Sequence, residues 1–110
     1  MEFFLINLKT PITENLLCYS INPAETQKID PNKSSYLISE PETISELPEG
    51  KYLLTQQKKE KLEDKELEEM AIELQKEILW RRLKPANKLM VRFFYEDNSP
   101  VIQLLRPISG

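Results

Sequence analysis

Apolar residues recur at helical spacing in the middle of the chain. Leu67, Met70, Ala71, Leu74 and Ile78 follow the i, i+3, i+4, i+7, i+11 pattern that places side chains on one face of an α-helix. The surrounding residues are mostly strong helix formers, and acidic residues come first while Arg81, Arg82 and Lys84 come last, as the helix dipole favours. Pro85 disfavours helical backbone at the residue before it. We therefore predict one long helix over about residues 61–84.

Strand patterns flank this helix on both sides. Residues 51–56 follow a Pro-Glu-Gly turn signal, and residues 89–95 alternate two faces of apolar and aromatic side chains. The turn residues Asp97, Asn98 and Ser99 then precede a further apolar run at 101–105, which predicts a β-hairpin. Weaker strand patterns occur at residues 3–8, 16–21 and 36–39.

These elements predict an α+β fold: an antiparallel sheet of four to six strands with one long helix packed on one face. We expect residues 1–110 to form a single domain, in which 1–50 is a proline-marked strand and loop region and 51–108 is a strand-helix-strand-strand module. One helix covers only one face of a sheet, so the other face or a strand edge needs protection. This argument predicts a homodimer.

Composition narrows the possible chemistry. The chain has 15 Lys and Arg against 18 Asp and Glu, a net charge of −3, which disfavours direct nucleic-acid binding. It contains no histidine and one cysteine, Cys18, so the commonest general base and the usual metal ligands are missing. With only two glycines there is no glycine-rich phosphate loop. We expect no enzyme activity, no catalytic residue, no metal and no cofactor.

The N-terminus points to the compartment. Met1 is followed by acidic Glu2, and the apolar run that begins at Phe3 stops at Asn7, which does not fit a secretory signal. No stretch approaches the length of a membrane span. We therefore expect a cytoplasmic protein without membrane contact.

Two places in the chain combine aromatic and basic residues. Trp80, Arg81 and Arg82 close the predicted helix, and an aromatic ring beside two guanidinium groups can bind a phosphate or an aromatic ligand. The favoured alternative is that Trp80 packs at the edge of the core while the arginines balance the helix C-terminus. Arg92 alternates in phase with Met90 and Phe94, so it shares a face with apolar groups. An ion pair with Glu96 is favoured, and contact with an anionic ligand is the alternative.

The second half of the chain also resembles a known family. The phrase Pro48-Glu49-Gly50-Lys51-Tyr52 before the helix and the apolar-Pro-apolar ending at Pro107 are similar to one module of gyrase-inhibitor-like small-molecule-binding domains. The resemblance covers about residues 47–108 and implies a ligand-binding or effector-sensing role. That family pairs two modules around a cleft, whereas residues 1–50 show no second helix pattern, so the resemblance implies a cleft that is either incomplete or completed by a second chain.

Together these features predict a non-enzymatic binding module that holds a small apolar or aromatic ligand between helix and sheet. The candidate ligand-binding residues are Tyr52, Trp80, Arg81, Arg92 and Phe94. The alternative is a protein-interaction adaptor that docks a partner on the acidic helix face or on an exposed strand edge.

Overall fold

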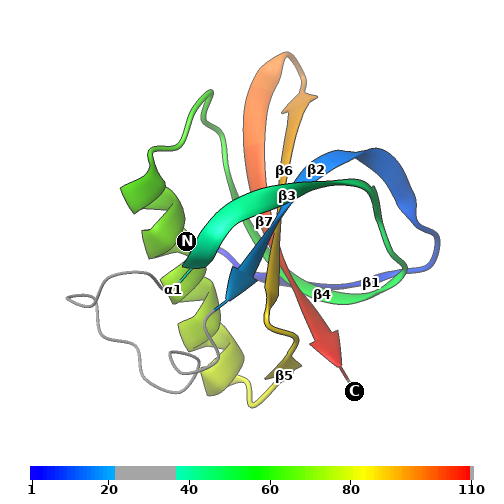
Figure 1. Ribbon diagram of the computed structural model, residues 1–110, viewed down its shortest axis with the longest axis vertical. Helices are drawn as coiled ribbons and strands as arrows, with labels where there is room; N and C mark the ends of the chain where they lie inside the picture. Colours follow the sequence, from blue (N-terminus) through cyan, green and yellow to red (C-terminus); the bar gives the residue numbers. More distant parts are fainter. Residues whose placement is uncertain (22–36, 110) are drawn as a thin grey trace.

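The structure, a computed structural model, describes residues 1–21 and 37–109 and shows one antiparallel sheet with a helix packed on it (Figure 1). The elements in chain order are β1 (Phe4–Leu8), β2 (Ile12–Ile21), β3 (Leu37–Leu47), β4 (Gly50–Gln57), α1 (Asp64–Trp80), β5 (Lys84–Pro85), β6 (Lys88–Glu96) and β7 (Ser99–Ser109). The strand order is β1-β4-β7-β6-β2-β3, and β5 pairs with β7. The predicted α+β class is confirmed, with seven strands because the two-residue β5 joins the sheet.

The predicted hairpin is formed by β6 and β7. Glu96 pairs with Ser99, so Asp97 and Asn98 are the two loop residues. Both have positive φ, +52° and +66°, as the tight hairpin turns with the right twist require. Asp and Asn tolerate this left-handed conformation better than most residues, which explains the turn at this point.

β2 and β3 are longer than their patterns predicted. Apolar segments were expected only at 16–21 and 36–39, and residue 36 lies outside the described residues, yet β3 continues through Pro41 to Leu47. Proline has no N–H to donate and is tolerated in an edge strand or at an irregularity. Both conditions hold here, because β3 ends the strand order and its register with β2 shifts between the pairs Cys18–Glu42 and Ser20–Ile38.

Two short connections fold the sheet over on itself. Residues 9–11 join β1 to β2, and residues 48–49 join β3 to β4, although neither pair of strands is adjacent in the sheet. The corner therefore brings Leu8, Ile12 and Leu47 close to Gly50. Gly50 has φ +143°, a conformation that other residues rarely adopt, so a glycine suits the start of β4.

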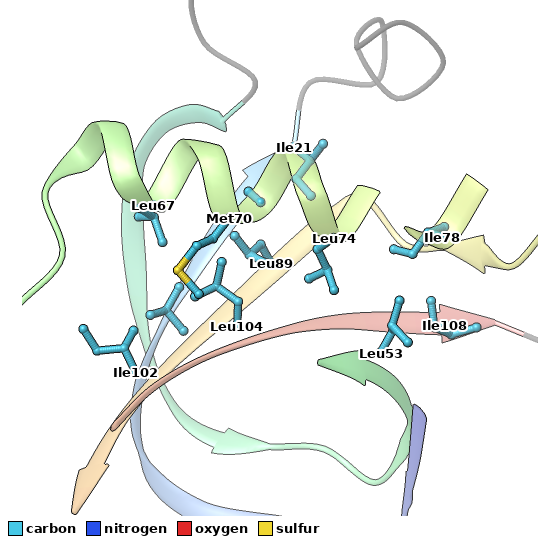
Figure 2. Packing of buried hydrophobic residues seen from close by; sticks show 12 residues of the cluster. Ile21, Leu53, Leu67, Met70, Leu74, Ile78, Leu89, Ile102, Leu104 and Ile108 are labelled. Carbon is cyan, nitrogen blue, oxygen red and sulfur yellow. The ribbon is translucent and has the colours of Figure 1, made fainter. Parts of the chain in front are cut away.

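The folded sheet has a hydrophobic core on each side. Figure 2 shows the helix-side core, in which Leu67, Met70, Leu74 and Ile78 of α1 point toward the sheet. The sheet contributes alternate residues of its strands. The members of this core are Ile21, Leu53, Leu67, Met70, Ala71, Leu74, Ile78, Leu89, Val91, Ile102, Leu104 and Ile108.

The opposite face carries an inner core, enclosed by the sheet itself. Its buried members are Leu16, Leu47, Tyr52, Leu54, Met90 and Leu105. These residues come from β2, β3, β4, β6 and β7, and partly buried Ile6 and Leu8 of β1 pack against them. The second face, which was expected to need protection, is therefore buried by the curled sheet itself. The homodimer itself stays a prediction.

The helix is shorter than the predicted 61–84 at both ends. It begins after Glu63, which makes no side-chain capping bond, and ends at Trp80. The Leu83 N–H donates to the Ile78 carbonyl and the Arg82 N–H to the Leu79 carbonyl, at 3.0 and 3.2 Å. This is the Schellman pattern of helix termination. The expectation that Pro85 stops the helix is wrong: the chain leaves the helix before it, and Pro85 pairs with β7.

Arg82 occupies a position that usually belongs to glycine. It has φ +57°, in the left-handed region that the Schellman pattern requires one residue after the cap. A side chain there costs about 1–2 kcal/mol. A cation near the helix C-terminus recovers only about 0.3–1 kcal/mol when it is exposed. Local stability alone therefore does not explain an arginine at this position.

Replacing Arg82 with glycine tests this interpretation. Arg82→Gly should stabilise the protein by about 1 kcal/mol, because glycine adopts the left-handed conformation without a Cβ penalty. Arg82→Ala is the matched control, since it removes the guanidinium but keeps the Cβ, and it should not stabilise. Urea unfolding midpoints measure both changes. A lower midpoint for Arg82→Gly than for the unmodified chain would contradict the assignment.

Candidate functional site

The five predicted ligand-binding residues do not converge on one cleft. Tyr52 is 3% exposed in the inner core, where its hydroxyl donates to the Pro48 carbonyl at 2.6 Å. Burial raises its pKa above the usual tyrosine value. Trp80 lies at the end of α1 and is 83% exposed, so it does not pack at the edge of the core. Arg81 pairs with Glu77, Nε to Oε2, at 2.6 Å.

Arg92 and Phe94 are the two predicted residues that do lie together. The guanidinium carbon of Arg92 is 4.8 Å from the centroid of the Phe94 ring. Such a cation–π contact is worth about 0.5–1 kcal/mol at an exposed site. The ion pair of Arg92 is with Glu14 of β2, so the predicted pairing with Glu96 is wrong.

Arg92 belongs to a polar row that crosses four strands. Its Nε donates to Glu14 and its Nη1 to the Gln103 Oε1 at 2.9 Å, while the Gln103 Nε2 donates to the Gln56 Oε1 at 3.0 Å. The row therefore links β2, β6, β7 and β4 beside the inner core. The charge of Arg92 is balanced by the Glu14 carboxylate, so the row has little affinity for an anionic ligand. Its hydrogen bonds across the strands instead favour one register of the sheet.

A buried cation on the other face was not predicted from the sequence. Arg106 of β7 is 1% exposed, and its Nη1 donates to the Gln75 Oε1 of α1 at 2.5 Å. Its Nε and Nη2 donate to the Ala86 carbonyl at 3.2 and 2.9 Å. The guanidinium thereby ties the helix, the sheet and the segment before β6 together. Arg106 alternates in phase with Leu104 along β7, so both side chains point toward the helix. This alternation is the sequence signal that could have identified Arg106 as buried.

The two edges of the sheet differ in a way that bears on function. β3 carries Pro41 and the charged residues Glu40, Glu42 and Glu46, features that discourage another strand from pairing. β1 has the sequence Phe-Leu-Ile-Asn-Leu, with no proline and no charge, and it pairs only with β4 among the described residues. Phe4 and Leu5 on it are 45% and 49% exposed. β1 is therefore the unprotected edge.

A hollow lies on each face of the sheet next to this edge. The hollow on the inner-core side measures about 370 Å³ and is lined by Glu2, Phe4 and Gln56 among others. The hollow on the helix side measures about 310 Å³, between Gln57 and the first half of α1. Neither includes any of the five predicted ligand-binding residues.

Carboxylates of α1 line the helix-side hollow. They are Glu66, Glu69 and Glu73, and Met1 and Met70 add apolar surface. Lys59 pairs with Glu66, and this hydrogen bond is the main reason why the pKa of Glu66 lies below its usual value. Lys76 pairs with Glu73 at 3.2 Å. The acidic face predicted on the helix therefore borders the unprotected edge.

Three other features were sought in residues 1–21 and 37–109: a metal site, a reactive thiol and a membrane-spanning helix. Within them, no three His, Cys, Asp or Glu side chains gather as a metal site. Cys18 is half-buried, and burial is the main cause that raises the pKa of its thiol, so it is protonated at neutral pH. No helix in these ranges has the length and apolar character needed to cross a membrane.

The polar row can be tested by removing one charge. Glu14→Gln should destabilise the protein by about 1–2 kcal/mol, because it leaves the largely buried Arg92 guanidinium without its counter-charge. Glu73→Gln is the matched control: its pair with Lys76 is exposed, and the change should cost less than about 0.5 kcal/mol. Urea unfolding measures both. Equal effects would show that the row has no special role.

Comparisons with known proteins complete the description of the site. A scan of protein-family models finds no model that matches this chain, and a search of curated proteins finds no matching sequence.

Proposed function

We propose that this chain is a protein-binding module that accepts an extended segment of another protein as an additional strand beside β1. The observation that carries this proposal is the contrast between the two sheet edges. β3 is guarded by Pro41 and glutamates, whereas β1 is neutral, apolar and partly exposed. Unpaired backbone groups along such an edge are a template for another strand.

The hollows beside β1 fit this mode of binding. Side chains of an added strand alternate between the two faces of the sheet. Phe4 pairs with Leu54 and so shares its inner-core side, while Leu5 pairs with Leu53 on the helix side. Phe4 lines the inner-core hollow, so side chains of the incoming strand on that face would lie next to it, whereas the helix-side hollow lies just before the start of β1, where Met1 lines it. In strand addition, main-chain hydrogen bonds supply affinity and such pockets supply specificity.

A small-molecule site between helix and sheet has weaker support. The helix-side core is filled by side chains that are each less than one tenth exposed (Figure 2). Of the five candidate ligand-binding residues, Tyr52 lies in the inner core and Trp80 lies on the surface at the helix end. The protein-interaction alternative agrees better with this arrangement.

Peptide selection tests strand addition directly. Peptides selected on the unmodified chain from a random phage-displayed library should bind at β1 and slow hydrogen exchange of the β1 amides, because strand pairing protects them. Phe4→Lys should weaken this binding about tenfold, a loss of ~1.4 kcal/mol, since a lysine guards a strand edge. Isothermal titration measures the affinity.

Two further variants make the result specific. Phe93→Lys is the matched control, because Phe93 of β6 is a phenylalanine of similar exposure, 53%, away from the edge. Leu5→Lys changes the helix side of β1 and should act like Phe4→Lys. The proposal fails if no peptide is selected, or if the selected peptides leave β1 exchange unchanged. A dimer that Phe4→Lys abolishes would assign the edge to a second copy and would also overturn it.

A further inference from the structure

We propose that the C-terminal end of α1 is a second docking surface, which binds an acidic segment of a partner protein. The surface consists of Leu79, Trp80, Arg82 and Lys84. It does not involve β1, so this proposal does not depend on the one above.

Exposed apolar side chains define the surface. Trp80 is 83% exposed and its neighbour Leu79 is 46% exposed. Tryptophan is strongly buried on average in folded proteins, so exposure to this extent is unusual. Tryptophan and arginine are also the residues most enriched among those that dominate protein–protein binding energy. Trp80 is the only tryptophan in the chain, and the protein does not use it in either core.

Backbone strain at Arg82 is an independent observation. Its φ of +57° falls in the left-handed region, at the position where glycine is most common after a helix. Strain of this kind, retained against local stability, often marks a functional position. Here it occurs two residues after the exposed tryptophan. The exposed Trp80 and the strained Arg82, neither of which stabilises the fold, therefore lie close together at the C-terminal end of α1.

The charges of this surface select the kind of partner. Arg81 is neutralised by Glu77, but no carboxylate among the described residues pairs with Arg82 or Lys84. Two cations within four residues of an exposed indole in the sequence suit a segment that carries both carboxylates and an apolar side chain. Guanidinium groups bind carboxylates in a fixed two-pronged geometry, which adds specificity.

A membrane surface fits these residues less well. Recognition of anionic lipid typically uses clusters of about four to eight Lys and Arg residues, more than this end of α1 provides. The observations therefore favour an acidic protein segment, and lipid binding becomes an outcome that the test can reveal.

The single tryptophan provides the readout. We would titrate the full chain with a synthetic peptide of repeating Glu-Glu-Leu triplets and record the fluorescence of Trp80. The expected result is a saturable blue shift, because docking removes the indole from water. A peptide of repeating Lys-Lys-Leu triplets should give no shift. A blue shift with phosphatidylglycerol vesicles but not with the acidic peptide would overturn the proposal, as would no shift with the acidic peptide.

Variants at Arg82 separate binding from folding. Arg82→Gly and Arg82→Ala should both weaken peptide binding about fivefold, the effect of losing one exposed charge pair. Their effects on stability should differ, since only the glycine relieves the strained backbone. Lys51→Ala, which removes an exposed cation from β4, is the control and should bind normally. Unchanged binding by Arg82→Gly, or equal loss with Lys51→Ala, would refute the assignment.

Discussion

The fold depends on the constraint that two short connections place on the sheet. Three residues between β1 and β2, and two between β3 and β4, join strands from opposite parts of the strand order. The sheet has to curl for these connections to close, and the curl encloses the inner core while α1 covers the other side. Both faces of one sheet are thereby buried with a single helix. Among the described residues, exposed apolar side chains include Phe4 and Leu5 on the edge at β1 and Leu79 and Trp80 at the end of α1.

Buried polar groups show how specifically the layers are joined. Arg106 crosses from β7 to the Gln75 side chain of α1 and to the Ala86 carbonyl, so one guanidinium links three segments. On the opposite side, the row through Arg92 links four strands. Burying a charge is costly unless its donors are satisfied, so each of these groups favours one arrangement of strands over alternatives.

The two proposed surfaces lie toward opposite ends of α1. The helix-side hollow near β1 involves the first half of the helix, whereas Trp80 and Arg82 lie at its end. A helix of 17 residues is about 25 Å long, so the surfaces are far enough apart to be occupied together. Their chemistry also differs: one is an apolar edge bordered by carboxylates, and the other combines an indole with two cations that pair with no carboxylate in residues 1–21 and 37–109. This separation is what an adaptor between two proteins requires.

The elements that could be predicted from the sequence are those whose signals are local. The apolar stripe from Leu67 to Ile78 specified the helix, and Asp97 with Asn98 specified the hairpin, because both patterns depend on residues close together in the chain. Three features depend on the folded chain: how the second face is covered, the pairing of Glu14 with Arg92 across 78 positions, and the position of β1 at an edge of the sheet among the described residues. The properties of Trp80 and Arg82 were only partly predictable from the sequence. Their aromatic and basic character was readable from the sequence, but the exposure and the left-handed backbone arise from where the chain leaves α1 to form β5. Pairing partners and exposure depend on strands distant in sequence, and no local periodicity records them.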